Sequence, residues 1–339
     1  MDGEKPFVTI AIASREDEPR IEACLRAALG QDYPRDRLEV IVADAMSMDA
    51  TREIILRVAG EDARVRMLDN PDRTRAAALN AIIEAGHGEI VVPMDPGGEY
   101  ARTHVSKCVD ALSAAPVEQL AIVPRTAGRT LTERALSAVQ RTRLAFAAGA
   151  ELAGGLEQAP AILGAVKRKA FARVGLYDPG TRVEEDVELS RRIAETGGAL
   201  AVRRDIVVHK TEASGFRELF KRHYQLGRSR ARTTVKERRV RSLRTLAPFA
   251  IVAGGAALGA TSSVQPITPF AGAIYALVTG AAAVRVGRTE GIVTIPIAWA
   301  AFPVMHVAHG VGFGTGLVRA LLKPDWQAHR KLDDEPESA

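Results

Sequence analysis

Acidic side chains stand at the ends of apolar runs in the N-terminal part of the chain. Asp44 and Asp95 each follow such a run, and Ser14 and Glu16 follow another. Open α/β sheets bind ligands at the carboxyl ends of their strands, so these positions form a candidate site. An ionised Asp44 only accepts hydrogen bonds, which suits the imide and ribose donors of a nucleoside.

A second acidic group, Glu184-Glu185-Asp186-Val187-Glu188, precedes an amphipathic pattern. Acids in a first helical turn satisfy free N–H groups and the positive end of the helix, so capping is one explanation of the run. Neighbouring carboxylates also raise each other's pKa toward a value useful for proton transfer. From the residues alone, both interpretations stay open.

Three further positions have a chemical and a structural interpretation. Arg73 and Arg75 either neutralise phosphates or are solvated arginines at a helix start. Gly164 either lets a sugar approach the backbone closely or marks a strand bulge. His209, at the end of a short apolar run, is more typical of a core or edge residue than of a metal ligand.

The elements that position these residues follow from the alternation of apolar runs with helical patterns. This alternation predicts a parallel α/β sheet. Strands are expected at 7–13, 39–43, 65–68 and 90–94, and helices from about Pro19, Asp49, Thr74 and Thr103, with Ser47 or Asp49 as a helix cap. The chain contains no G-x-G-x-x-G after the first strand and no Walker A sequence, which argues against dinucleotide enzymes and P-loop NTPases.

Charge is concentrated in one segment. Residues 214–245 hold eleven Lys or Arg against two Glu, a net +9 in a chain whose total is +5. The remainder is therefore mildly acidic, which excludes a uniformly basic nucleic-acid-binding protein. A basic amphipathic helix lying on anionic lipid is the simplest interpretation of the segment.

Two charge-free stretches, 245–284 and 291–318, follow the basic segment. A membrane-spanning helix needs about 20 apolar residues, so the first stretch predicts a helical hairpin divided near 262–266, with a buried soluble hairpin as the alternative. Arg285 and Arg288 satisfy the positive-inside rule for that hairpin. The second stretch predicts a third crossing, with a re-entrant or interfacial segment as the alternative. The sequence shows no signal peptide, and two cysteines are too few for a disulfide framework. The N-terminal body is therefore expected in the cytoplasm, a reducing compartment.

Several short motifs occur in order between about residues 6 and 230, and together they resemble the family 2 glycosyltransferases. They are the opening strand with its polar loop (8–16), Gln31-Asp32-Tyr33-Pro34, the segment 40–51, the segment from Arg75 to Asn80, and Gly88-Glu89-Ile90-Val91-Val92. The resemblance implies the GT-A fold. Together with the charge pattern, it predicts a catalytic domain at 1–213, a basic interfacial helical segment at 214–245, membrane helices at 246–322 and a polar tail at 323–339. The membrane region, including residues 306–316, is similar to exopolysaccharide transferases of the succinoglycan type.

The resemblance also implies residue roles. Asp186 matches the general base for the acceptor hydroxyl, and Glu185 orients the acceptor. Asp95 matches the first acid of a metal-binding D-x-D motif, for Mg or Mn, but Gly97 replaces the second acid. The implied donor-binding residues are Ser14, Glu16, Asp44, Arg75, Asp95 and Gly164. Gln225 and Arg228 match a Q-x-x-R element that contacts acceptor and diphosphate, with Ser229 in place of the Trp of processive synthases.

These inferences predict an inverting transferase at the inner membrane, multi-pass, with its catalytic domain in the cytoplasm. Its expected partners are a nucleotide-sugar donor, most simply a UDP-sugar, a polyprenyl-linked saccharide acceptor, membrane lipids and other proteins of polysaccharide assembly. Exopolysaccharide or cell-envelope synthesis is the expected setting. Two alternatives remain: transfer to polyprenyl phosphate itself, and a catalytically silent nucleotide-binding or scaffolding subunit, for which Gly97 is the main argument.

Overall fold

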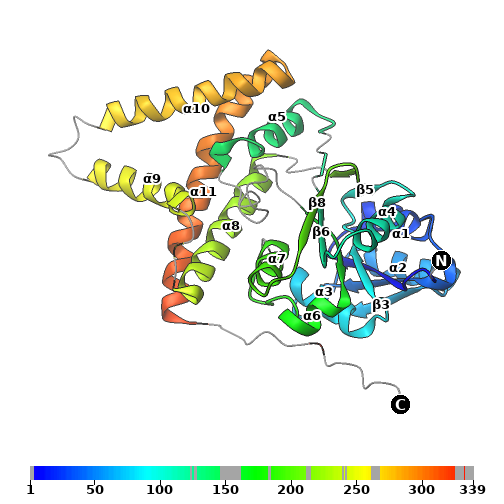
Figure 1. The fold of residues 1–339 in the computed structure, drawn as a ribbon. Helices are drawn as coiled ribbons and strands as arrows, with labels where there is room; N and C mark the ends of the chain where they lie inside the picture. The colour runs from blue at the N-terminus through cyan, green and yellow to red at the C-terminus, as the bar shows by residue number, and fades with distance from the viewer. Residues whose placement is uncertain are drawn as a thin grey trace. The chain divides into compact units, whose positions relative to one another are not determined.

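The structure is a computed structural model, and it describes residues 4–122, 124–125, 128–145, 162–181, 185–210, 215–238, 240, 243–260, 268–324 and 332. The chain divides into two compact units (Figure 1). The first comprises 1–125, 149–210 and 327–339, and the second comprises 126–148 and 211–326. Residues 126–148, expected in the catalytic domain, thus group with the helical second unit.

A seven-stranded sheet of order β3-β2-β1-β4-β7-β6-β8 forms the centre of the first unit. Strands β1 to β4 are parallel, β7 is antiparallel to both β4 and β6, and β8 is parallel to β6. The four predicted strands are confirmed with small shifts at their ends. The strands are β1 (Val8–Ser14), β2 (Leu38–Asp44), β3 (Val65–Asp69), β4 (Ile90–Pro93), β6 (Gln119–Ile122), β7 (Ile162–Lys167) and β8 (Leu200–Arg203).

Helices cover both faces of this sheet. Because side chains alternate along a strand, Ile10 and Ile12 of β1 pack into one core with Leu25, while Ala11 packs into another with Phe171. The first core includes residues of α1 (Glu18–Leu29), α2 (Thr51–Glu61) and α4 (His104–Ser113). The second includes residues of α3 (Arg75–Ala85), α6 (Arg168–Val174) and α7 (Glu185–Glu195).

A small second sheet pairs β5 (Gly98–Tyr100) with β9 (Val208–Lys210) in antiparallel fashion. The register sets Gly98 opposite Lys210 and Tyr100 opposite Val208. His209 lies in β9 with an exposed side chain, which agrees with its interpretation as an edge residue. This pairing joins the loop after β4 to the last strand of the first unit.

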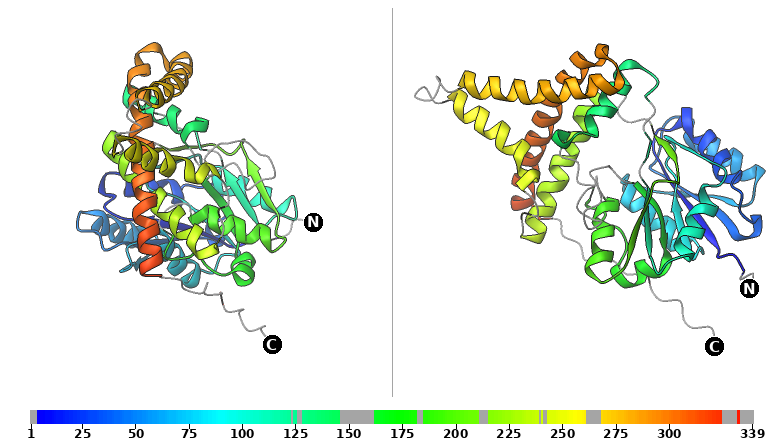
Figure 2. Two further views of the ribbon diagram at one scale, coloured as in Figure 1. Left: turned by 90° about the vertical axis from the view of Figure 1, so that its left-hand side faces the viewer. Right: turned by 45° about the horizontal axis from the view of Figure 1, so that its top comes forward.

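The second unit is helical. It contains α5 (Leu131–Gln140), α8 (Phe216–Glu237), α9 (Leu243–Ala260), α10 (Thr268–Glu290) and α11 (Ile295–Leu322), with α8 and α11 running side by side (Figure 2). Pro269–Glu290 and Ile292–Leu322 are long and apolar enough to cross a membrane, whereas the apolar part of α9, Leu246–Gly255, is shorter. The predicted break at 262–266 lies outside the described residues.

Helix α11 runs without a break through four glycines at 310, 312, 314 and 316. A Cβ atom at Gly312 would lie 2.1 Å from the Tyr224 carbonyl of α8, and one at Gly310 would lie 2.6 Å from the Pro248 carbonyl of α9. Gly316 likewise faces α8, at Arg228, and Gly314 faces α9, at Phe249. The glycines therefore allow α11 to pack closely against two helices at once.

The two histidines of α11 pack inside the second unit. His306 donates a hydrogen bond through Nε2 to the carbonyl of Leu144 (2.8 Å) and accepts one at Nδ1 from the Tyr275 hydroxyl (2.8 Å). His309 is buried, and its ring stacks on that of Phe313. Both histidines thus make packing contacts within the second unit.

Candidate active site

The loops after β1 and β2 are bonded to each other at the carboxyl edge of the sheet. The Glu16 backbone N–H donates to Ser47 Oγ (2.9 Å), and a Glu16 carboxylate oxygen accepts from the Met48 N–H (3.0 Å). Ser14 is buried, and its hydroxyl donates to Asp17 (3.3 Å). Ser14 and Glu16 therefore lie at the expected edge, where they shape the loops through internal hydrogen bonds.

Three non-glycine residues at this edge have left-handed backbone conformations. They are Glu16 (φ 53°), Met46 (φ 56°) and Arg73 (φ 54°), which follow β1, β2 and β3 respectively. Such conformations cost about 1 kcal/mol each and persist where the surrounding structure fixes them, often at functional sites. Arg73 itself is exposed, as its interpretation as a solvated arginine predicts.

Asp44 lies at the end of β2 and is fully buried. Its carboxylate accepts from the Ser47 N–H (2.9 Å), the Ser47 hydroxyl (2.6 Å) and Arg52 (2.9 Å). Ser47 thus binds Asp44 and does not cap α2. The first N–H of that helix, at Thr51, instead donates to the Asp49 carboxylate (3.1 Å). A nucleoside contact at Asp44 remains a prediction.

Arg75, the first residue of α3, joins three carboxylates from distant parts of the first unit. Its guanidinium lies 3.3 Å from Asp95 at the end of β4, 2.8 Å from Glu185 and 3.2 Å from Asp186, which begin α7. The interpretation of Arg75 as a solvated helix-start residue is therefore wrong, because ion pairs with acids at two other elements hold its side chain. The structure brings together Arg75, Asp95, Glu185 and Asp186, four of the residues predicted for the site.

The electrostatics of this cluster shift the pKa values of Asp95 and Glu185 in opposite directions. Burial works to raise the pKa of Asp95, but Arg75 and Lys210 lower it, and the net result lies well below the ordinary value. The pKa of Glu185 is raised by burial and by Asp186, although Arg75 opposes the rise. Acids of one cluster with opposite pKa shifts are typical of sites that move protons.

A tight turn after β4 holds Asp95. The Asp95 backbone N–H donates to the Tyr100 hydroxyl (2.7 Å), and the Gly98 N–H donates to the Asp95 carbonyl (2.9 Å). A Cβ atom at Gly98 would lie 2.6 Å from the Tyr100 ring, so glycine is required for this close approach. Lys210 of β9 completes the turn, with Nζ 2.6 Å from Asp95 Oδ2.

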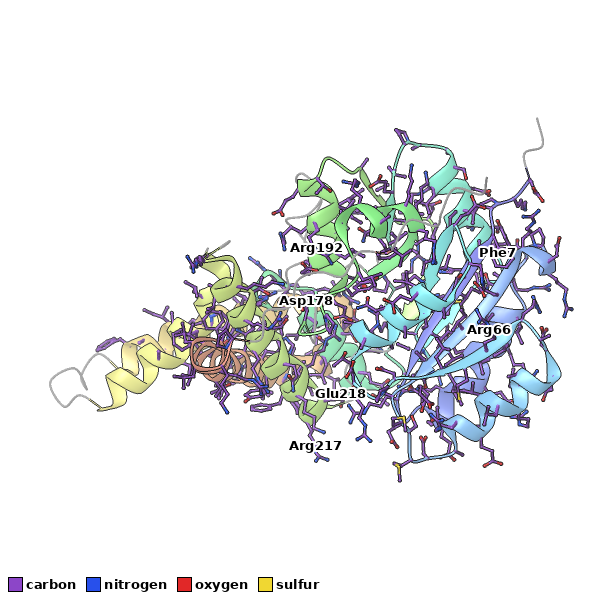
Figure 3. The ribbon with its side chains drawn as sticks, turned by 90° about the horizontal axis from the view of Figure 1, so that it is seen from below. Phe7, Arg66, Asp178, Arg192, Arg217 and Glu218 are labelled. Carbon is purple, nitrogen blue, oxygen red and sulfur yellow. The ribbon has the colours of Figure 1, made fainter. Side chains whose placement is uncertain are left out.

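The loop before α7 is anchored from two sides. Arg192 of α7 donates to the carbonyls of Val174 (2.5 Å), Gly175 (3.0 Å) and Leu176 (2.8 Å). Asn80 of α3 donates to the Tyr177 carbonyl and accepts from the Tyr177 N–H, both at 2.9 Å. Figure 3 labels Arg192 together with Asp178, which follows Tyr177. These contacts fix residues 174–177, which precede the acidic start of α7 in the sequence.

Four contributors to this arrangement were not predicted: Asn80 and Arg192 as anchors, and Tyr100 and Lys210 at the turn. Asn80 falls in the Arg75-to-Asn80 motif, so the motif was a usable signal for it. Tyr100 and Lys210 lie in none of the sequence motifs, and Arg192 lies in the amphipathic pattern that follows the acidic group. For Lys210, the one sequence signal is its place directly after His209 at a strand end.

The described residues do not fit a divalent cation held by two protein acids. Asp95 is the single acid of the D-x-D position, because Gly97 has no side chain, and both Asp95 oxygens are bonded, to Arg75 and to Lys210. Over the part of the chain that the structure describes, no group of three or more His, Cys, Asp or Glu is placed to hold a metal ion. A metal at Asp95 remains a prediction.

Gly164 lies at a bulge between β6 and β7, where the register shifts between Leu120 and Ala121. A Cβ atom there would lie 2.5 Å from Ile122 of β6. The bulge interpretation of Gly164 is therefore confirmed, and its contact with a donor sugar remains a prediction.

Gln225 and Arg228 lie on α8, in the second unit. The Gln225 side-chain oxygen is buried without a hydrogen-bond partner within the described residues. The Arg228 guanidinium lies 5.9 Å from the centroid of the Tyr224 ring. Their roles toward acceptor and diphosphate remain predictions.

Comparisons with known proteins agree with this architecture. Residues 9–174 match Glycosyl transferase family 2. The chain is 29% identical over 284 residues to the succinoglycan biosynthesis protein ExoA of Rhizobium meliloti, covering 81% of this chain and 84% of that protein. It is 29% identical over 104 residues to a beta-monoglucosyldiacylglycerol synthase of Trichormus variabilis, covering 30% and 22%.

One solved structure resembles most of the chain. It is the mannosyltransferase PcManGT from Pyrobaculum calidifontis in complex with GDP-Man and Mn2+, with a TM-score of 0.61 and 22% identity, covering 95% of this chain and 89% of that one. At this identity the likeness establishes the fold. A mostly parallel sheet flanked by helices, with acids gathered at its carboxyl edge, thus has the GT-A fold.

Its residues 9–174 belong to glycosyl transferase family 2, and the chain is a glycosyltransferase. The resemblance found in the sequence motifs and the GT-A fold that it implied are both confirmed.

Proposed function

We propose that this glycosyltransferase moves a sugar, with inversion, from a nucleotide-sugar donor to a lipid-linked saccharide at the inner face of the cell membrane. The observation that carries the proposal is the convergence of Asp95, Glu185 and Asp186 on Arg75. Similarity to a succinoglycan biosynthesis protein over 81% of the chain supports exopolysaccharide synthesis as the setting.

In the proposed reaction, the acceptor hydroxyl oxygen attacks the anomeric carbon, and the bond from that carbon to the diphosphate oxygen breaks. Asp186 accepts the hydroxyl proton, and the leaving diphosphate takes the electron pair. Glu185, beside it, orients the acceptor. Ser14, Glu16 and Asp44 lie on the loops that would receive the nucleotide. Positioning of both substrates supplies much of the rate enhancement in such a transfer.

The test is Asp186→Asn in the full chain, assayed with radiolabelled UDP-sugars and a membrane lipid extract as acceptor source. We expect transfer to fall by at least about 100-fold, as loss of a general base does, while donor binding is retained. Glu195→Gln, at the other end of the same helix, is the matched control. Near-normal turnover of the Asp186 variant would refute the assignment.

The nature of the acceptor is separated by product analysis. After lipid extraction, mild acid releases an oligosaccharide if the acceptor was a lipid-linked saccharide, and a single sugar if it was polyprenyl phosphate. We expect the oligosaccharide.

Membrane attachment is the second part of the proposal. Helices α10 and α11 expose large apolar side chains, among them Phe270 (71% exposed), Leu277 (73%) and Leu322 (75%), which suit lipid. Exposed basic residues of α8, such as Arg217 and Lys221, suit anionic headgroups. A polyprenyl-linked acceptor stays in the bilayer, so a membrane-held enzyme meets it at a higher effective concentration.

Arg228 belongs to the proposal as a contact to the diphosphate or acceptor. Arg228→Glu is expected to damage catalysis, whereas Arg217→Glu is expected mainly to weaken flotation with anionic vesicles. Arg239, where charge reversal is likewise expected mainly to loosen membrane contact, lies outside the described residues. Equal effects of both reversals on both measurements would remove the distinction.

A further inference from the structure

Lys210 is held at the cluster by its backbone. In β9 it pairs with Gly98 of β5, and its N–H donates to the Arg125 carbonyl (3.1 Å). Both flanking contacts lie within the first unit, so the lysine stem starts from a fixed point. Its ammonium lies 2.6 Å from Asp95 Oδ2.

The Lys210–Asp95 pair is partly open to solvent. The Lys210 side chain is 32% exposed and that of Asp95 is 21% exposed. A lysine ammonium has three donors, so one bond to Asp95 leaves two for an incoming anion. Arg75, in contrast, divides its donors among Asp95, Glu185 and Asp186.

The backbone at position 97 would accept a side chain's first atom. A Cβ atom at Gly97 would meet nothing closer than 3.7 Å, the distance to an Arg20 nitrogen. The site has no acid at this position, and a lysine contacts the remaining acid, Asp95.

We infer that Lys210 binds the diphosphate of the donor, and that this ammonium supplies the positive charge that a cation held by two acids would otherwise supply. The inference rests on the proposed function. When the bond from the anomeric carbon to the diphosphate oxygen breaks, the electron pair stays on that oxygen. The Lys210 ammonium stabilises the added charge by hydrogen bonding and keeps its proton.

The experiment measures binding of UDP and GDP to the detergent-solubilised full chain by calorimetry, in EDTA and in Mg2+ or Mn2+. We expect the wild type to bind one of the two in EDTA within about threefold of its affinity with metal, because Lys210 supplies the charge. Lys210→Met is expected to lose about tenfold or more in EDTA, the size of a charged hydrogen bond. Lys210→Arg should retain most of the affinity.

Two controls make the result specific. Lys169→Met removes an exposed lysine of α6 and should change nothing. Uridine and guanosine lack the diphosphate, so Lys210→Met should leave their binding unchanged. If Lys210→Met weakens nucleoside binding or lowers the melting temperature, the comparison with Lys210→Arg, which keeps the charge, separates loss of the charge from damage to the fold. Lys210→Met combined with Gly97→Asp restores two acids and should make UDP or GDP binding depend on Mg2+.

The outcomes separate this inference from the proposed function. If the wild type loses diphosphate binding in EDTA and Lys210→Met binds as well as the wild type, a metal at Asp95 carries the charge and the inference is overturned. If the wild type binds neither UDP nor GDP under any condition, the proposed function fails, and the inference fails with it.

Discussion

Asn80 binds both backbone polar groups of Tyr177, a residue 97 positions further along the chain. Tyr177 is buried, so neither group has water as an alternative partner. Through this pair of bonds, α3 fixes the segment that leads to the acidic start of α7. The Arg75-to-Asn80 motif therefore supplies an ion-pairing residue at one end and a backbone anchor at the other.

We predict that Asn80→Ala destabilises the protein by about 2 kcal/mol, because two buried backbone groups lose their partners. Transfer should also slow, since the segment before Glu185 and Asp186 is released. Asn80→Asp keeps an acceptor for the Tyr177 N–H and should lose less. Thermal melting and turnover check this, and equal melting of the wild type and Asn80→Ala would contradict it.

Removal of Arg75 is predicted to produce a pH-dependent loss of stability. Burial and Asp186 already raise the pKa of Glu185, and without Arg75 the pKa rises further. The folded state then takes up a proton that the unfolded state has released, so stability falls as the pH rises above the ordinary Glu value toward the raised one.

Arg75→Met should therefore melt higher at pH 5 than at pH 7.5, with a loss on the order of 3 kcal/mol at the higher pH. Arg75→Lys, which keeps a charge, should show a smaller effect. A variant that melts equally at both pH values would show that Arg75 does not control the Glu185 carboxyl.

The Tyr100 hydroxyl is predicted to support the Asp95 turn. Tyr100→Phe leaves the Asp95 N–H without its acceptor, at a cost of about 1–2 kcal/mol. Nucleoside diphosphate affinity should fall with it, because the Asp95 side chain shifts. Burial and Asp95 raise the pKa of Tyr100 well above its ordinary value, so the wild type should show no Tyr100 titration up to about pH 10. Unchanged melting and affinity would disprove this role.

Close packing in the second unit is tested by a pair of glycine substitutions. Gly312→Ala places a Cβ atom 2.1 Å from the Tyr224 carbonyl, and we expect a loss of about 2 kcal/mol or more from overpacking. Gly272→Ala on α10 meets nothing within 4 Å and should leave the melting temperature unchanged or slightly raised. Similar melting of the two variants would contradict the close approach of α8 and α11.

The first half of the sheet could be predicted because each of its strands is a clear apolar run followed by a helical pattern. Strands β6 and β8 escaped prediction. Each has four residues, as β4 has, but β4 is entirely apolar and buried, whereas β6 begins with the polar Gln119 and β8 is only partly buried. In so short a segment, alternation between apolar and polar positions carries little information. The antiparallel placement of β7 depends on pairing across distant segments and leaves no local pattern.

The acids of the site could be predicted from their places at strand ends and at a helix start, but their partners could not. Arg75 meets Asp186 across 111 positions and Lys210 meets Asp95 across 115. Such contacts arise from topology, so a helix-start arginine and a strand-end lysine look like ordinary surface residues in the sequence. The same limit applies to Asp44. Its strand-end position is clear from the sequence, but the binding of its carboxylate by Ser47 and Arg52 is not.

The alternating glycines of α11 also limit which sequence changes this helix can accept during evolution. Neighbouring positions on a helix are rotated by about 100°, so one inserted or deleted residue before Gly310 would turn all four glycines away from α8 and α9 together. Substitutions on the outward side of α11 leave those contacts intact. Homologous chains should thus vary freely in the outward residues of this helix while keeping its length up to the glycines constant.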